Sequence, residues 1–127
     1  MIRLIKTLAP CILASTLLVA GTAHAQEANF PNRPIKLIVG LTPGASSDTV
    51  AREVAKGLTE RLKVPVVVEN RPGANTIIAS NMVAKATPDG YTFLVSNSMN
   101  ATNPWVYDKL PYDYHKDLKH VVLLGLA

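Results

Sequence analysis

Three short segments of the chain concentrate small residues with hydroxyl, amide or carboxylate groups, a chemistry suited to holding a ligand rather than to breaking a bond. The residues expected to contact that ligand are Thr42, Gly44, Ala45, Ser46, Ser47, Asp48, Gly73, Ala74, Asn75, Thr76, Ser96, Asn97 and Ser98. A helical pattern begins after the first segment, so the free N–H groups and positive dipole end of that helix would point at the segment. The pattern therefore predicts a site for a small acidic ligand.

Enzymatic chemistry finds less support in the sequence. There is no Gly-x-Ser-x-Gly nucleophile motif, and residues 40–44 lack the Gly-Lys-Ser/Thr ending of a phosphate-binding loop. His115 and His120 are five residues apart without a cysteine nearby, which does not match a zinc spacing. We therefore expect no catalytic residue, no metal and no cofactor. The alternative is a secreted α/β enzyme that acts on small carboxylates with Asp48 or Asp89 as the base.

The same residues also have structural interpretations. Ser46, Ser47 and Asp48 are of the types that cap helices, and on the pattern alone capping and ligand contact are about equally supported. An acidic residue near a helix N-terminus contributes about 0.3–1 kcal/mol, but it also offsets the positive potential that an anion needs. Asp48 is therefore predicted either to cap the helix only or to face a ligand's ammonium group. For Arg71 we favour solvation or pairing with Glu69 over a role as a carboxylate clamp.

Alternating strand and helix patterns separate the three segments. Strands are predicted at residues 35–39, 66–69, 91–95 and 121–124, and helices from the end of the first segment to about residue 62 and over 76–85. Residues 96–100 are predicted as a polar loop, and residues 102–120 as a short helix with a surface excursion. This alternation indicates right-handed crossovers and a parallel sheet, and hence an α/β fold. The three segments would share the carboxyl edge of the sheet, where such folds bind ligands.

The apolar patterns also predict which faces are buried. In the first helix, the residues that recur every four positions form an apolar stripe joined by two alanines: Val50, Val54, Leu58 and Leu62, with Ala51 and Ala55. The three valines at 66–68 suggest that the second strand is buried on both faces. The predicted apolar face of the second helix consists of Ala79, Met82, Val83 and Ala86.

Residues 1–25 have the pattern of a cleaved export signal and are not expected to belong to the fold. Arg3 and Lys6 precede an apolar stretch over 8–20, and Ala23-His24-Ala25 forms an A-x-A cleavage site before Gln26. Cleavage would leave residues 26–127 as one α/β domain, exported to the periplasm.

Composition excludes several other classes of protein. The leader removes two of the 13 basic residues and none of the 9 acidic ones, so the mature net charge would be +2. That value is too small to indicate nucleic acid as a partner, and no basic run interleaved with aromatics occurs. The one cysteine, Cys11, lies in the leader, so the mature chain is expected to contain neither a disulfide nor thiol chemistry.

Several segments, in order, resemble the tripartite tricarboxylate transporter substrate-binding proteins, also called the Bug family. The segments that carry the resemblance lie at residues 33–39 with Pro43-Gly44 and Asp48, at 66–74 (Val-Val-Val-Glu-Asn-Arg-Pro-Gly-Ala, the most specific), at 88–92, at 109–113 and at 116–117. The resemblance implies the two-lobed type II periplasmic binding protein fold. It further implies a cofactor-free receptor, monomeric when complete, that binds a tricarboxylate, a dicarboxylate or an acidic amino acid. Such receptors deliver the ligand to a membrane permease.

Three departures from the family pattern bear on these expectations. Ala45 stands where the family usually has a second glycine, and Asn75 and Thr76 stand in a usually glycine-rich segment. The added side chains are expected to restrict positive φ and close approach of the backbone to a ligand. The third departure is length, because the second lobe of the family is missing here and the chain would stop within a fourth strand. A truncated product without function of its own is therefore a further alternative.

Overall fold

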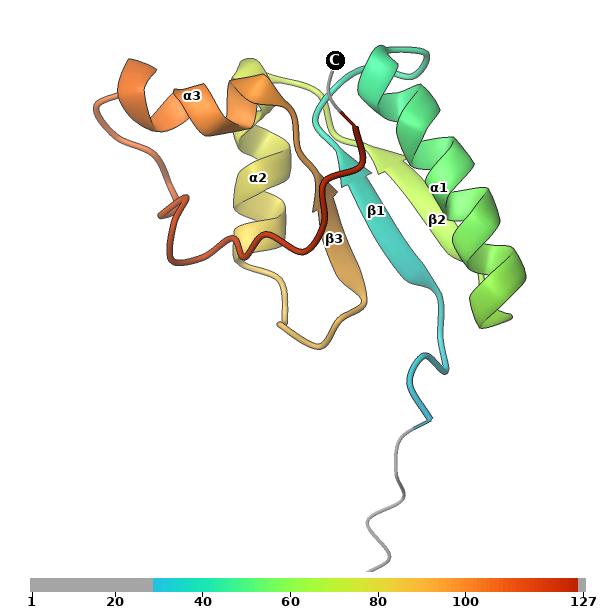
Figure 1. Ribbon diagram of the computed structural model, residues 1–127. Helices are drawn as coiled ribbons and strands as arrows, with labels where there is room; N and C mark the ends of the chain where they lie inside the picture. The colour runs from blue at the N-terminus through green and yellow to red at the C-terminus, as the bar shows by residue number, and fades with distance from the viewer. Residues whose placement is uncertain (1–28, 126–127) are drawn as a thin grey trace, which may run out of the picture.

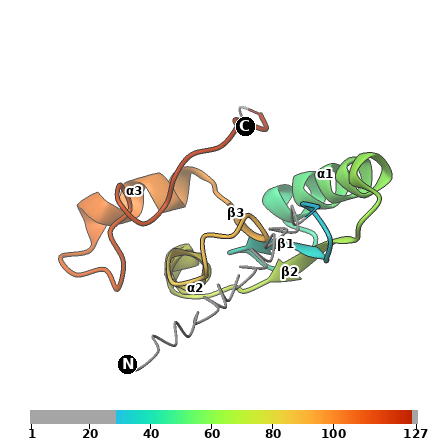
Figure 2. The same cartoon turned by 90° about the horizontal axis from the view of Figure 1, so that it is seen from below.

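The computed structural model describes residues 29–125, which form an α/β unit around a parallel three-stranded sheet. The strands are β1 (Ile35–Val39), β2 (Val66–Asn70) and β3 (Thr92–Val95), in the order β2-β1-β3. Helix α1 (Ser46–Leu62) covers one face of this sheet, and α2 (Ile77–Ala84) covers the other (Figures 1 and 2). The predicted strand–helix alternation and the parallel sheet are confirmed. The predicted export signal at residues 1–25 lies outside the described residues.

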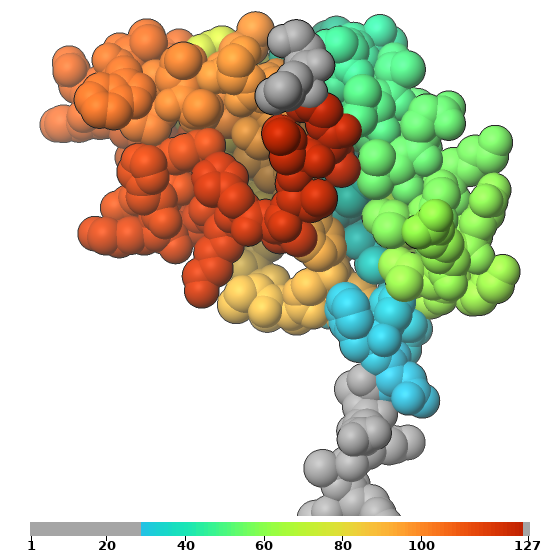
Figure 3. All heavy atoms as spheres, viewed as in Figure 1, coloured from blue at the N-terminus to red at the C-terminus, as the bar shows by residue number. Residues whose placement is uncertain are grey.

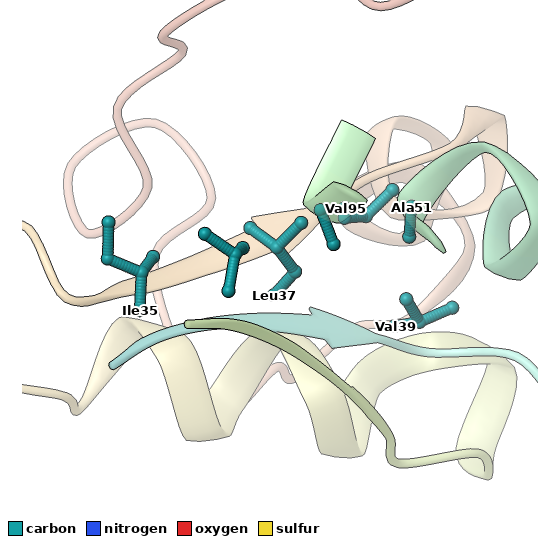
Figure 4. Packing of buried hydrophobic residues seen from close by; sticks show 7 residues of the cluster. Ile35, Leu37, Val39, Ala51 and Val95 are labelled. Atoms are coloured by element: carbon teal, nitrogen blue, oxygen red, sulfur yellow. The ribbon is translucent and has the colours of Figure 1, made fainter. Parts of the chain in front are cut away.

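The larger part of the core lies between the sheet and α1. Ile35, Leu37 and Val39 point from β1 toward this helix, and Ala51 and Ala55 meet them (Figure 4). Because alanine has a small side chain, the helix backbone approaches the sheet closely. On the other face of β1, Ile38 is fully buried, which gives this central strand the two-sided burial typical of parallel sheets.

The predicted stripe of α1 is correct only in part. Val54 and Leu58 pack partly buried against the core, but Val50 and Leu62 are exposed by 43% and 36%. A spacing of four drifts around a helix that has 3.6 residues per turn, so the two ends of the stripe leave the contact face. The residues buried along α1 are Asp48, Ala51 and Ala55.

Burial on both faces of β2 was a wrong prediction. Val66 is buried and faces α1, whereas Val67 is 49% exposed. β2 is an edge strand, and α2 packs against β1 and β3 rather than behind β2. The far face of β2 therefore has no helix over it within residues 29–125.

The second predicted helix is present but differs at its start and in its buried face. A short 3-10 turn, η1 (Ala74–Thr76), leads into α2. The buried side chains of α2 are Ala79 and Ser80, and Met82 is 37% exposed. A serine occupies the buried face because Asn100 supplies it with a polar partner.

The segment predicted as a loop at 96–100 contains the start of a helix, α3 (Ser98–Val106). Asn97 caps it by accepting a hydrogen bond from the Met99 N–H at 3.0 Å, and the Asn100 side chain accepts one from the Asn97 N–H at 2.8 Å. This reciprocal arrangement is a capping box, which satisfies two N–H groups that a loop would leave open. The helix therefore begins earlier than the apolar pattern indicates.

The fourth predicted strand, residues 121–124, is not a strand. The chain after α3 runs on the α1 side of the sheet, outside its plane (Figures 1 and 2), and lies on the surface (Figure 3). Val121, Val122 and Leu123 are 72–74% exposed. A β-branched run favours a strand only where a neighbouring strand supplies a hydrogen-bonding ladder, and here the run is not beside one. Across residues 29–125, none of the helices has the length and apolar character that crossing a bilayer requires.

Candidate ligand-binding site

The strand order brings two of the three predicted segments together at the centre of the carboxyl edge. The chain steps from β1 to β2 on one side and then crosses back to β3 on the other. Such a reversal leaves an opening between the loops after β1 and β3, and ligands of open α/β sheets bind there. The first segment follows β1 and the third follows β3, so both flank this opening.

The first segment presents an uncapped helix start to the opening. Residues Thr42 to Ala45 form a turn closed by the Ala45 N–H, which donates to the Thr42 carbonyl at 3.2 Å. Gly44 has φ +86° and follows Pro43, as a type II turn requires. α1 begins at Ser46, and its cap residue Ala45 makes no side-chain hydrogen bond to the helix. The first-turn N–H groups are therefore left to a ligand or to solvent, and the predicted side-chain capping is wrong.

Asp48 is buried within the first turn instead of capping it. It is 2% exposed and accepts hydrogen bonds from the Gly44 N–H at 2.8 Å, from Arg52 Nε at 2.9 Å and from Asn70 Nδ2 at 2.9 Å. Hydrogen bonding to Arg52, then to Gly44 and Asn70, holds the pKa of this carboxyl well below its usual range. With three donors on its two oxygens, Asp48 closes the Gly44 turn and joins it to the end of β2.

Asn70 and Arg52 are structural residues of the site that the sequence analysis missed. Asn70 Nδ2 also donates to the Leu41 carbonyl at 3.0 Å, and Arg52 Nη2 donates to Asn70 Oδ1 at 3.2 Å. The spacing of four between Asp48 and Arg52 was a readable signal of an ion pair on a helix. The partnership with Asn70, 22 residues further along, had no local signal.

The second segment has positive φ at four consecutive residues, three of which are not glycine. Gly73 has φ +130°, and it is followed by Ala74, Asn75 and Thr76 with φ +45°, +50° and +71°. Non-glycine residues in this region cost of order 1–3 kcal/mol each, least for asparagine, and persist only where surrounding contacts hold them. The side chains of Asn75 and Thr76 were expected to restrict positive φ, but both residues adopt it, so they add strain to this backbone without preventing it. No such strain arises at Ala45, whose φ of −69° any residue adopts.

Contact with Gly40 brings the second segment to the end of β1. Thr76 is 2% exposed, and a Cβ on Gly40 would lie 2.8 Å from the Thr76 Cβ. Only glycine leaves room for the threonine at this distance. The second segment thus reaches the end of β1 before the chain enters α2, which packs against β1 and β3.

Side chains of α3 hold the second segment in its strained form. Asn103, fully buried, donates through Nδ2 to the Asn75 carbonyl at 2.8 Å and accepts from Asn75 Nδ2 at 2.6 Å. Ser80 donates to the Thr76 carbonyl at 3.1 Å and accepts from Asn100 Nδ2 at 2.7 Å. The sequence analysis also missed Asn100 and Asn103. The density of asparagine in this helix was visible in the sequence, but nothing in its neighbourhood indicates that these side chains bond to the second segment.

The remaining predicted residues of the third segment differ in their surroundings. The side chain of Asn97 is hydrogen-bonded as the cap of α3, whereas Ser96 and Ser98 are exposed. Ser96 Oγ makes one long contact with the Asn97 carbonyl, at 3.4 Å. The two serine hydroxyls are therefore accessible at the opening. Arg71 pairs with Glu69, as favoured from the sequence.

The surface of the described chain also has hollows away from the carboxyl edge. Two hollows of the described chain lie elsewhere: one of about 240 Å³ at the amino ends of β1 and β3, beside Arg33 and Tyr91, and one of about 510 Å³ below α3, beside Tyr112. Neither includes a residue of the three segments.

Comparison with known proteins decides the family. The family model described as "Tripartite tricarboxylate transporter family receptor" matches residues 50–127. The chain belongs to this family. Among curated relatives, it is 47% identical over 97 residues to a UPF0065 protein of Bordetella pertussis, covering 76% of this chain and 29% of that protein. It is 40% identical over 109 residues to BugT of the same organism, covering 84% and 33%.

Solved structures support the same conclusion and the fold class. The periplasmic binding protein BugD matches with a TM-score of 0.66 at 35% identity, over 69% of this chain and 29% of that one. The malate-bound MatC of Rhodopseudomonas palustris matches with 0.63 at 32% identity, over 69% and 30%. An R. palustris protein solved with adipate matches with 0.64 at 38% identity, over 68% and 29%.

The chain thus has the parallel-sheet lobe of a periplasmic binding protein. It spans about a third of the length of the curated relatives that it matches. The family is one of receptors, in agreement with the expectation that the chain is not an enzyme.

Proposed function

We propose that this chain is the ligand-binding N-terminal lobe of a periplasmic receptor for small carboxylates. The observation that carries the proposal is the uncapped start of α1 at the opening between β1 and β3. A carboxylate there would accept hydrogen bonds from the N–H groups of Ser46 and Ser47 and meet the positive end of the helix dipole. Because Asp48 is already paired with Arg52, its charge offsets this potential less than an unpaired carboxylate would.

Two further features support a carboxylate at this edge. α2 also starts without a side-chain cap, so its N-terminus and the backbone of residues 73–76 offer a second set of donors. Ser96 and Ser98 add exposed hydroxyls on the opposite side of the opening. Two similar structures hold malate and adipate, both of which are dicarboxylates. We assign this ligand class, and delivery to a tripartite tricarboxylate-type permease, to the complete receptor.

One lobe is expected to bind weakly. An exposed helix terminus contributes about 0.3–1 kcal/mol per charged group, against roughly −8.2 kcal/mol for micromolar affinity and −4.1 kcal/mol for millimolar affinity. A second lobe that closes over the ligand would supply the remaining contacts and exclude water. The 127-residue chain should therefore bind a carboxylate in the millimolar range or more weakly.

Nuclear magnetic resonance on the ¹⁵N-labelled chain tests the proposal, because it detects weak binding residue by residue. Titration with malate and with adipate should shift the amide signals of Ser46 and Ser47. Gly44→Val, which places a branched side chain at φ +86°, should abolish these shifts, whereas Gly57→Ala in the middle of α1 should not. The proposal fails if neither ligand moves these signals, or if the shifts persist unchanged in Gly44→Val.

We further propose that the mature chain begins at Gln26 in the periplasm, after removal of residues 1–25. Periplasmic material should then give an N-terminal sequence that starts at Gln26 or at its cyclised form. Recovery of the intact Met1 terminus from that compartment would contradict this assignment.

A further inference from the structure

Asn75 occupies the strained second segment with an orientation that its neighbours determine. Asn103 Nδ2 lies 2.8 Å from the Asn75 carbonyl and 3.4 Å from Thr76 Oγ1. If the Asn103 amide were turned over, its oxygen would face the carbonyl oxygen at 2.8 Å without a proton between them. The amide of Asn103 is therefore fixed with its nitrogen toward the backbone and its own oxygen on the other side.

This fixed oxygen in turn decides which way the Asn75 amide points. Asn103 Oδ1 can only accept, and it lies 2.6 Å from the Asn75 side chain, so the atom that Asn75 places there must be its nitrogen. The Oδ1 of Asn75 consequently points away from Asn103. Asn75 is an exposed residue, and among residues 29–125 no donor reaches this oxygen.

The oxygen of Asn75 is an acceptor held in place in the second segment, next to Thr76, which abuts Gly40 at the end of β1. Rotation about the side-chain bonds would break the bond to Asn103, and rotation of the backbone is restricted by the contacts of Thr76. An acceptor that needs no further ordering can favour a ligand that offers it a donor, because the added hydrogen bond then costs little side-chain entropy. A carboxylate oxygen offers no donor at neutral pH. The Asn75 oxygen would therefore accept a hydrogen bond from a substituent beside the ligand's carboxylate group.

We propose that Asn75, oriented by Asn103, is a specificity-determining residue that selects carboxylates bearing a hydroxyl or ammonium donor beside the carboxylate group. This inference rests on the proposed function. It makes Asn103 a positioning residue, which does not touch the ligand itself. It also gives a role to Asn75, at a position where a glycine would relieve the strain of the positive φ.

Three four-carbon dicarboxylates test the inference because they differ only at one carbon: succinate has no donor, malate has a hydroxyl and aspartate has an ammonium group. Dissociation constants come from amide shifts of the ¹⁵N-labelled full chain. One hydrogen bond is expected to favour malate, aspartate or both over succinate by roughly two- to twelvefold. In Asn75→Gly, which suits φ +50°, the preference should fall below about twofold. Asn32→Gly, the same change at the amino edge of the sheet, should retain it.

The outcomes separate this inference from the proposed function. A wild-type preference for malate identifies the hydroxyl as the donor, and one for aspartate identifies the ammonium group. Equal binding of all three ligands by the wild type would overturn the inference and leave the carboxylate site standing, and this result needs no variant. A preference that survives in Asn75→Gly would also overturn it. If none of the three ligands shifts any amide, the proposed function fails and the inference fails with it.

Discussion

Replacement of Gly40 by alanine tests the contact that joins the first and second segments. The added Cβ would lie 2.8 Å from Thr76 Cβ, 3.0 Å from Cγ2 and 3.2 Å from Cα, whereas carbon atoms pack best at about 3.5–4.0 Å. Thr76 has little freedom to retreat, because its carbonyl accepts from Ser80 and its hydroxyl faces Asn103. Overpacking of this kind costs about 1–3 kcal/mol in the free energy of unfolding.

A second change shows whether the clash with Thr76 causes the loss of stability in Gly40→Ala. Thr76→Gly removes both clashing side-chain atoms and suits φ +71°, so it should by itself have a small net effect. In this background the cost of Gly40→Ala should fall to below about 1 kcal/mol, since only the contact with Cα remains. The coupling between the two sites should therefore be about 1–2 kcal/mol, within the range for residues in contact.

Urea unfolding of the wild type, both single variants and the double variant provides the measurement, with the midpoint and slope fitted separately. Gly57→Ala is the matched control, because nothing lies within 4 Å of its new Cβ and it should stabilise α1 by about 0.5–1 kcal/mol. The reasoning is refuted if Gly40→Ala behaves like Gly57→Ala. It is refuted equally if Gly40→Ala costs as much with glycine at position 76 as with threonine.

Three other predictions concern the ion pair, the α3 network and the exposed apolar segment. Because the pKa of Asp48 is depressed in the folded state, its stabilising effect is present above the unfolded value of about 3.9 and is lost as the pH falls from there through the lower folded value. Asp48→Asn should therefore flatten the pH dependence of the unfolding midpoint between about pH 5 and pH 2, and an unchanged slope would contradict this. Asn103→Leu should cost about 1–3 kcal/mol in urea unfolding, because it leaves the Asn75 carbonyl without its donor. The same change at an exposed position, Asn29→Leu, should cost under about 0.5 kcal/mol, and equal costs would count against the network. Val121→Thr with Leu123→Thr should reduce light scattering on concentration, since both side chains are exposed by 73–74%; unchanged scattering would contradict this.

The sequence by itself determined the three strands of the sheet, the order in which they alternate with α1 and α2, and the edge at which the three polar segments lie. The β-branched runs predicted at 35–39 and 66–69 became β1 and β2, and the alternation dictated a parallel sheet with short crossovers. These properties follow from periodicity and from turn residues such as Pro43 and Gly44, which act over a few neighbouring positions. The pairing of Arg71 with Glu69 was likewise a local matter.

Only the tertiary structure decided which of those residues are exposed and what holds the segments together. Val67 has the same composition around it as Val66, yet it faces solvent because α2 packs against β1 and β3 and leaves the far face of the edge strand β2 uncovered. Asp48 is buried because Asn70 reaches it from the end of β2, and Thr76 keeps its left-handed backbone because Gly40 leaves space and α3 supplies buried amides. Each of these contacts joins residues at least 22 positions apart. Local propensity carries no information about them, because their partners are set by where the crossovers return the chain.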